Sequence, residues 1–442
     1  MSALNVFQRF WLGCTSSLLG STLVRRAVAS VYLIKARRVK VQTAAQAVLK
    51  IRHLCSALRL IEQGDKHRAV ELELLKVRDD ASFSRSEWTA ALTREPQPGP
   101  MLLQKGVILK PKVSDDEPGV LFISFEHQWA QLLRLPEVDQ LAKDYTLVVS
   151  PTWSPPHSPL NVIFPTLWPK PVHCLISHDD DMTTLPRLSS NYQMISLLAS
   201  SWVNEEVFSP RAKSERDLDL VMVANFARFK RHVRFFQALR EMPSDLRVLL
   251  IGQKDGNRDQ KDVLREAEAF GVRDRFELRV SMPHPQVLES LARAKASIVL
   301  SLREGSCVAV AESLFADTPV GLMESAHIGS SRFINEQTGR FLRESHLAQD
   351  IMALINSAAT LQPRARALSD GIGTRRSSEI LNEHLKKHAL AAGQNWTRDL
   401  ARMQWCPNPK RLDEADEAWA EKEHAAITQR FGVMIGAPRV TK

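Results

Sequence analysis

Residues 301–320 join an apolar run to an apolar helical pattern through a short polar turn, and this junction limits the possible folds more than any other segment. The apolar run, residues 296–302, has the length and composition of a buried strand. It breaks at residues 304–306, Glu-Gly-Ser, and apolar side chains then return at helical spacing at Val308, Ala311, Leu314 and Phe315. A buried strand that leads through a turn into a helix is typical of an α/β domain.

Two carboxylates flank the start of the predicted helix. Glu304 is in the turn and Glu312 follows eight residues later, so both side chains can reach one ligand above the strand ends. We expect the backbone N–H groups of Ser306 and Cys307 at the helix N-terminus, which favours an anion, and Gly305 lets the chain approach a phosphate closely. The alternative is an ordinary strand-turn-helix junction with incidental carboxylates.

Other short apolar runs occur in two groups along the chain. They are residues 119–125, 145–150, 172–177 and 194–199 in the first group, and residues 218–223, 246–252 and 276–280 in the second. Continuous apolar runs fit strands that are covered on both faces, so each group predicts a parallel sheet with helices between its strands. A chain of 442 residues has room for two or three such domains.

The composition divides the chain into four segments. We expect a basic helical extension with a Pro-rich linker over residues 1–105, a first α/β domain over 106–210, a second over 211–362, and a helical tail over 363–442. Loops that follow the strands of a parallel sheet line its ligand site. His157 and His178 lie in such loops and are candidate cleft residues, although residues of this kind are more often solvated or part of a helix cap.

Residues 1–61 contain ten Lys or Arg residues and no Asp or Glu, which predicts an anionic partner. The apolar pieces between these charges are too short to span a bilayer. We prefer an interfacial helix on an anionic membrane surface. A targeting peptide and a helical subdomain with a solvated basic face remain as alternatives, whereas nucleic acid is a weaker candidate because no recognised binding module accompanies the charge.

Five cysteines are scattered through the sequence without the spacing of metal ligands. A disulfide framework and a zinc site are therefore not expected. This cysteine usage fits a reducing compartment. We predict a cytoplasmic protein with peripheral contact to the inner face of the membrane.

The Glu304 and Glu312 pair, followed by Thr-Pro-Val at residues 318–320, resembles the signature of retaining glycosyltransferases of family 4, also called group 1. The loop at residues 224–232 resembles the family's diphosphate-binding element, with Lys230 at the position of the family lysine. Asn225 stands where that element usually has Arg, so Arg228 or Arg231 is expected to supply the second cation. Ser306-Cys307 replace the usual Phe-Gly.

This resemblance implies the GT-B fold, in which two Rossmann-like domains face a cleft. It also implies transfer of a sugar from a nucleotide sugar to an acceptor hydroxyl with retention, in glycolipid or polysaccharide biosynthesis. Lys230 would bind the diphosphate together with Gly305, Ser306 and Cys307. Glu304 would hold sugar hydroxyls, and Glu312 would hold the ribose.

We expect no metal ion and no cofactor besides the nucleotide sugar substrate. The acceptor is expected to be a saccharide or a lipid-linked saccharide. A non-catalytic protein that binds sugar nucleotides, or a membrane-associated scaffold, is the alternative.

Overall fold

The computed structural model describes residues 21–61, 63–80, 82–93, 99–405 and 408–436. The chain forms two compact units. Residues 203–373 make one unit, here called the inserted unit. Residues 22–202 and the chain after residue 373 make the other, called the split unit because the inserted unit interrupts it in sequence.

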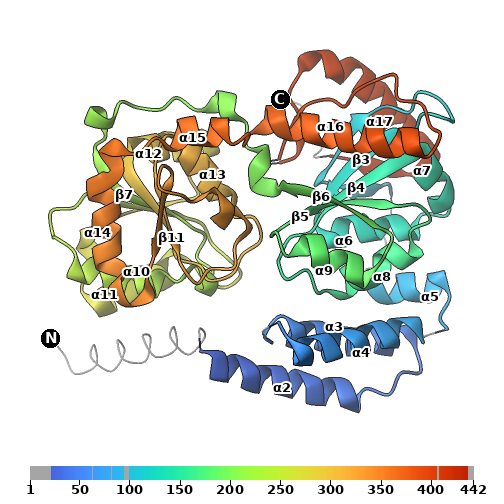
Figure 1. Ribbon diagram of the computed structural model, residues 1–442, viewed down its shortest axis with the longest axis horizontal. Coiled ribbons are helices and arrows are strands. Elements are labelled where there is room, and N and C mark those ends of the chain that lie inside the picture. Colours follow the sequence, from blue (N-terminus) through green and yellow to red (C-terminus); the bar gives the residue numbers. More distant parts are fainter. Residues whose placement is uncertain (1–20, 62, 81, 94–98, 406–407, 437–442) are drawn as a thin grey trace. The chain divides into compact units, whose positions relative to one another are not determined.

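The inserted unit is built on a six-stranded sheet in which every strand pairing is parallel (Figure 1). Its spatial order is β9-β8-β7-β10-β11-β12, so chain order reverses between β7 and β10. This is the Rossmann strand order, with its topological switch point between those two central strands. The strands are β7 (Leu218–Val223), β8 (Val248–Gly252), β9 (Glu277–Val280), β10 (Ala294–Val299), β11 (Val320–Met323) and β12 (Gly339–Leu342).

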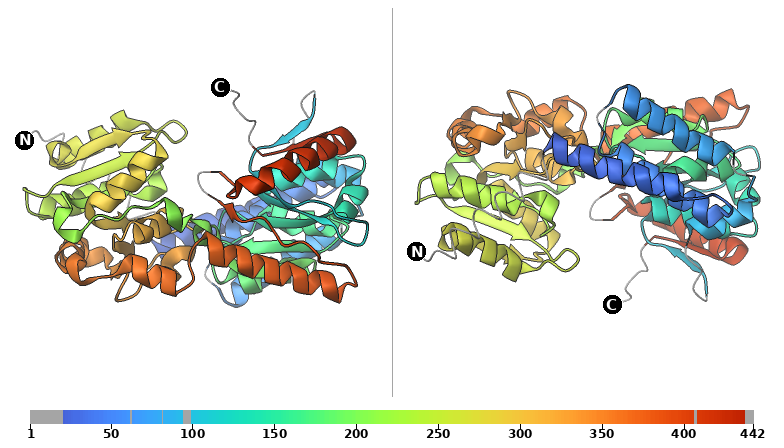
Figure 2. Two further views of the ribbon diagram at one scale, coloured as in Figure 1. Left: turned by 90° about the horizontal axis from the view of Figure 1, so that it is seen from above. Right: turned by 90° about the horizontal axis from the view of Figure 1, so that it is seen from below.

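Helices cover both faces of this sheet (Figure 2). Apolar side chains of α10, α11 and α14 share one core with the strands, whereas α12 and α13 pack together against β7, β10 and β11. Each crossover helix therefore buries an apolar stripe and leaves its polar face outside. The helices are α10 (His232–Glu241), α11 (Gln260–Phe270), α12 (His284–Arg293), α13 (Val308–Phe315), α14 (Leu347–Ser357) and α15 (Pro363–Ser369).

The split unit contains a five-stranded sheet whose strands follow chain order. The edge strand β2 is antiparallel to β3, and the remaining pairings are parallel. Because the order does not reverse, this sheet lacks the switch point of the inserted unit. The strands are β2 (Gly106–Lys110), β3 (Gly119–Ser124), β4 (Tyr145–Ser150), β5 (Val172–Ile176) and β6 (Tyr192–Leu198).

The two faces of this second sheet are covered by different parts of the chain. On one face, alternate strand residues share a core with α3 (Ala44–Leu58), α7 (Val138–Asp144), α8 (Pro159–Leu167) and α9 (Asp181–Leu188). On the other face, the intervening residues pack against α16 (Thr374–Ala391). The N-terminal helices and the returning C-terminal segment thus complete the same unit.

Shorter elements complete the split unit. Strand β1 pairs in parallel with β15, and β13 pairs with β14 in an antiparallel ribbon. Their bounds, with those of the remaining helices, are α2 (Thr22–Arg38), α4 (Asp65–Asp79), α5 (Arg85–Leu92), β1 (Met101–Leu103), α6 (Glu126–Trp129), β13 (Met403–Gln404), β14 (Lys410–Arg411), α17 (Glu417–Phe431) and β15 (Val433–Ile435).

The α/β class, the two Rossmann-like units and the helical N- and C-terminal regions are confirmed. Among the helices of the described ranges, none has the length and apolar character needed to cross a membrane.

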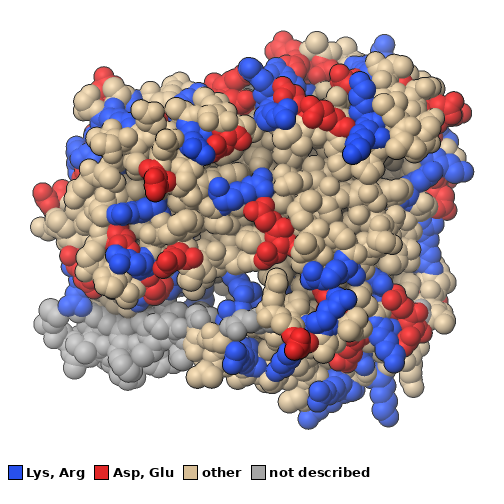
Figure 3. Space-filling model, viewed as in Figure 1, with Lys and Arg blue, Asp and Glu red and all other residues tan. Residues whose placement is uncertain are grey.

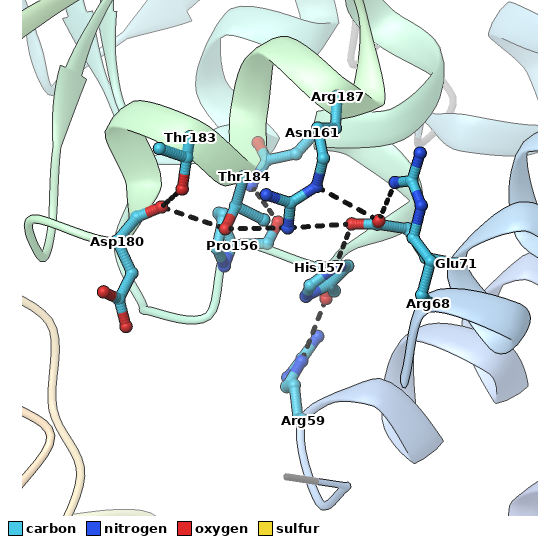
Figure 4. A network of polar contacts seen from close by, with 10 residues as sticks. All are labelled: Arg59, Arg68, Glu71, Pro156, His157, Asn161, Asp180, Thr183, Thr184 and Arg187. Carbon is cyan, nitrogen blue, oxygen red and sulfur yellow. Dashed lines mark hydrogen bonds and ion pairs between the residues drawn. The ribbon is translucent and has the colours of Figure 1, made fainter. Parts of the chain in front are cut away.

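A buried carboxylate joins the N-terminal helices to the sheet of the split unit (Figure 4). Glu71 on α4 is fully buried, and its side chain accepts hydrogen bonds from Arg68 at 2.6 Å and from Arg187 of α9 at 3.2 Å. His157 Nε2 lies 3.5 Å from the same carboxylate. Burial would raise the pKa of Glu71, but hydrogen bonds from His157, Arg187 and Arg68 outweigh it and lower that pKa to about 2. The carboxylate is therefore charged.

We predict that Glu71→Gln lowers the free energy of unfolding by about 2–4 kcal/mol at pH 7, because it leaves two arginines facing a neutral amide. Glu73→Gln on the same helix is the control, because Glu73 is 41% exposed and lies 4.0 Å from Lys50. It should cost less than about 1 kcal/mol. Urea unfolding of both variants measures these differences.

The pH dependence of the Glu71 effect follows from the sign of its pKa shift. The folded pKa, about 2, lies below the ordinary value of 4.5, so this stabilisation is present above about pH 4.5 and is lost as the pH falls toward 2. The difference between wild type and Glu71→Gln should therefore shrink in acid. Equal effects of the two substitutions, or a difference that does not change with pH, would contradict this account.

Candidate functional site

Two loops meet at the switch point of the inserted unit. One follows β7 and the other follows β10, and these strands are direct parallel neighbours, with Val221 opposite Ser297. The carboxyl ends of neighbouring parallel strands lie at the same sheet edge, where ligands bind in open α/β sheets. The loops contain Lys230 and Glu304, which the sequence places 74 residues apart.

An ion pair connects these loops. Lys230 Nζ lies 2.6 Å from Glu304 Oε1, and the two side chains are 16% and 10% exposed. Burial would lower the pKa of the Lys230 ammonium, but the negative charges that Cys307 and Glu304 can carry raise it above its ordinary value. Burial also raises the pKa of the Cys307 thiol, which leaves Glu304 as the effective anion. Lys230 is therefore a shielded cation with one bound carboxylate.

The turn after Glu304 leads into α13 through a left-handed residue. Cys307 precedes the helix with φ 50° and ψ 76°, a conformation that a residue with a Cβ rarely adopts. Gly305 O accepts a hydrogen bond from Gly329 N at 2.9 Å, and Cys307 O accepts one from Ser330 Oγ at 3.4 Å. The segment at residues 329–330 thus fixes the turn, and the first N–H groups of α13 start at its end.

The second carboxylate, Glu312, is also paired with a cationic group. Glu312 lies on α13 and is 7% exposed, and its Oε1 is 2.7 Å from His284 Nε2 at the beginning of α12. The hydrogen bond from Glu312 raises the pKa of His284, against the opposing effect of burial. Sequence reasoning did not select His284 as a site residue. The structure shows that it contacts a candidate site residue, and its place after β9, at the same sheet edge, is the signal that could have indicated this.

The loop after β7 places its other candidate residues differently. Asn225 Nδ2 donates to Asp255 at 3.2 Å, and Asn225 Oδ1 accepts from Ala227 N at 3.4 Å. Arg231 is held by Glu344 at 2.6 Å and by Leu300 O at 3.2 Å, so its guanidinium supports the loop.

Arg228 is exposed, and no hydrogen bond or ion pair joins its guanidinium to another side chain or carbonyl in the described ranges, although its backbone O accepts from Arg231 N at 3.0 Å. Of the two arginines considered for the second cation, Arg228 is therefore the one available to a ligand.

His157 and His178 both lie in the split unit. His157 is 1% exposed and packs against the Glu71 network, so its imidazole is part of a buried wall. His178 follows β5 and is partly exposed, with Nδ1 accepting a hydrogen bond from Asp180 N at 3.2 Å. Neither residue belongs to the inserted unit that holds Lys230 and the two glutamates.

The inserted unit also contains an Asp-Leu-Asp sequence at residues 217–219, a spacing that can bind a metal ion in other proteins. Here each carboxylate is paired with a cation. Asp217 lies 2.6 Å from Arg293, and Asp219 lies 2.8 Å from Lys295. Both stand at the amino end of β7, opposite the edge that holds Lys230 and Glu304. This geometry gives the pair a structural role.

Comparison with known proteins finds a family model that matches part of the chain. Residues 203–372 match the family model described as glycosyl transferases group 1. The match coincides with the inserted unit to within one residue and includes both ion pairs of the site. The group 1 expectation from the sequence is thus supported for this unit. A search of curated proteins found no match to the sequence.

Similar solved structures include a TarM variant from S. aureus, in complex with fondaparinux, α-GlcNAc-glycerol and UDP. It is 12% identical over 61% of this chain and 55% of that chain, with a TM-score of 0.49. Sucrose-phosphate synthase from Thermosynechococcus elongatus is 16% identical over 62% and 74%, with a TM-score of 0.48. HepE from Anabaena, in complex with UDP, is 13% identical over 63% and 79%, with a TM-score of 0.47. The chain thus spans about half of the TarM structure.

We predict that His284 titrates above its ordinary pKa of 6.5, and that Glu312→Gln lowers its pKa because burial then acts unopposed. The stabilisation from this pair is complete below about pH 6.5 and is lost as the pH rises through the raised pKa. Histidine NMR titration measures both values. Glu289→Gln on the same helix is the control, since Glu289 pairs with Arg211. An unchanged His284 pKa in Glu312→Gln would contradict the pairing.

Proposed function

We propose that this protein is a glycosyltransferase that moves a sugar from a nucleotide sugar to an acceptor hydroxyl with retention of configuration. The Lys230–Glu304 ion pair carries the proposal, because it lies at the switch point of a Rossmann sheet within the segment that matches group 1 glycosyltransferases. A shielded lysine beside a helix N-terminus suits a nucleoside diphosphate, the group that departs in such a reaction.

The departing diphosphate gains negative charge as its bond to the sugar breaks. Lys230, the first N–H groups of α13 and the exposed Arg228 can stabilise that charge without a metal ion. The phosphate oxygen can itself accept the proton of the acceptor hydroxyl, so the reaction needs no separate protein base. Retention follows if the acceptor approaches the same face of the sugar that the diphosphate leaves.

The ion pairs couple donor binding to sugar recognition. A diphosphate competes with Glu304 for Lys230, since the ammonium now binds that carboxylate at 2.6 Å. Once Lys230 turns to the phosphate, Glu304 can accept hydrogen bonds from sugar hydroxyls. Glu312, held by His284 at 2.7 Å, can accept hydrogen bonds from the ribose in the same way.

One observation favours a non-catalytic alternative. Asn225 occupies the position at which the family usually has a cation, and it binds Asp255. With Asn in place of the family's Arg, a diphosphate has one buried cation, Lys230, and one exposed cation, Arg228. A protein with this site could bind a sugar nucleotide without turning it over. A measurement of donor turnover distinguishes such a binding protein from a glycosyltransferase.

Contact with an anionic membrane surface is part of the proposal. Helix α2 contains no acidic residue in its first turn, and its last turn carries Lys35, Arg37 and Arg38. Its side chains Val31 and Ile34 are about half exposed, so apolar and basic groups occur on one helix. Lys and Arg side chains are frequent on the surface over α2 and α3 in Figure 3. Flotation of the protein with anionic vesicles tests this contact.

We predict that one of a panel of nucleotide sugars releases its nucleoside diphosphate when mixed with the protein, and that Glu304→Ala abolishes this release. Lys230→Met should reduce the rate about 10²- to 10³-fold, because it removes a charge that stabilises the leaving group. Glu268→Ala on α11 is the control, since that carboxylate is exposed and lies outside the site.

NMR of the product's anomeric proton reports retention or inversion in the same assay. Donor binding without release under every acceptor mixture would favour the non-catalytic alternative. Release that continues in Glu304→Ala would contradict the assigned site.

A further inference from the structure

A separate cavity of about 310 Å³ lies wholly within the split unit. It is lined by the segments that follow β3 and β4, at the carboxyl edge of that sheet, and by residues of α3. This is the edge at which α/β sheets bind ligands. The cavity is therefore built from the N-terminal helices and from the sheet together.

The loop before α8, which lines the cavity, is held in place by hydrogen bonds at several points. Arg59 Nε donates to His157 O at 2.9 Å, and Asn161 Nδ2 donates to Pro156 O at 2.7 Å (Figure 4). His157 rests in turn on the buried Glu71. A loop fixed in this way loses little conformational entropy when a ligand binds.

The charged groups around the cavity favour an anion. Arg52 of α3 and Arg59, directly after its last residue, lie seven residues apart, about two helical turns, and both are exposed and line the cavity. Arg52 O accepts a hydrogen bond from Ser56 Oγ at 2.9 Å, but its guanidinium has no hydrogen-bond or ion-pair partner among the described residues. Glu126 is the carboxylate of the lining, and its two oxygens accept hydrogen bonds from the backbone and hydroxyl groups of Thr152.

The apolar part of the lining suits a ring next to that anion. Trp153 lines the cavity and is 39% exposed. Aromatic faces pack well against the C–H groups of sugar rings and other flat apolar groups. Phe125, directly before Glu126, has φ 67°, and such backbone outliers cluster at ligand sites.

We infer that this cavity binds the acceptor, and that the acceptor carries a phosphate ester beside its sugar ring. The inference rests on the proposed glycosyltransferase function and specifies its second substrate. The phosphate would bind Arg52 and Arg59, and the ring would lie against Trp153. The same chemistry occurs in a soluble sugar phosphate and in the headgroup of a lipid-linked saccharide.

The full-length protein is titrated with glucose 6-phosphate and with glucose, and vesicles of phosphatidylglycerol or phosphatidylcholine are tested by flotation. The variant is Arg52→Gln, and Lys66→Gln on α4 is the control because Lys66 is exposed and lies outside the cavity. We expect glucose 6-phosphate to bind more tightly than glucose, and Arg52→Gln to weaken it about tenfold. Lys66→Gln should leave binding unchanged.

Binding of anionic vesicles that Arg52→Gln weakens, with no binding of the soluble sugar phosphate, supports the inference and identifies a lipid source. Equally tight binding of glucose and glucose 6-phosphate, no binding of either glucose 6-phosphate or anionic vesicles, or affinities unaffected by Arg52→Gln would overturn it. If a variant with both Val31→Ser and Ile34→Ser loses flotation while Arg52→Gln retains it, the vesicle contact belongs to α2. That result overturns the claim that the cavity binds a lipid headgroup.

Binding of nucleoside diphosphates is measured in parallel with the same proteins. It concerns the inserted unit, so it should be equal in wild type and Arg52→Gln. If the wild type binds nucleoside diphosphates but shows no phosphate-dependent acceptor binding, only the inference about the cavity is rejected. If the wild type binds no nucleoside diphosphate, the proposed function itself is rejected.

Discussion

The ion pair between Lys230 and Glu304 is the interaction on which the candidate site depends. It exists because β7 and β10 are neighbours at the centre of a sheet whose strand order reverses between them. Each side chain is mostly covered, and each would be costly to bury alone. The pair thus holds a cation and an anion at a sheet edge, where a charged ligand can take the place of one of them and bind the other.

The same principle operates at the second pair and in the split unit. His284 neutralises Glu312, and two arginines neutralise Glu71, so each buried carboxylate has a cationic partner on another helix. The consequences differ with exposure. Glu71 is fully buried and stabilises the attachment of α4, whereas Glu312 is paired with His284, which is 33% exposed and whose pKa the hydrogen bond from Glu312 raises.

Much of the fold could be predicted from local sequence pattern. The predicted strands at residues 145–150 and 218–223 coincide with β4 and β7, because continuous apolar runs bounded by polar residues allow few other structures. The edge strand β2 was not predicted. Its pairing with β3 is antiparallel and depends on a partner that a local pattern does not specify.

The candidate site was predicted in its residues but not in its contacts. Sequence spacing and family resemblance selected Lys230, Glu304 and Glu312. The place of His284 after β9 puts it at the same sheet edge, but spacing alone does not show that it contacts Glu312, 28 residues away. The cavity of the split unit was missed for the same reason, since Arg52 and Trp153 meet only through folding. His157 was predicted as a cleft residue from its loop position. Its imidazole is buried against Glu71 and forms part of the wall of the cavity in the split unit.

Calorimetric titration of the full-length protein with nucleoside diphosphates tests the central claim most directly. If Glu304 competes with the diphosphate for Lys230, the two single variants should have effects of opposite sign. Glu304→Gln should tighten binding of the diphosphate that the wild type prefers, and Lys230→Met should weaken it about tenfold or more. Weaker binding in both variants, or unchanged binding in both, would contradict a site organised around this ion pair.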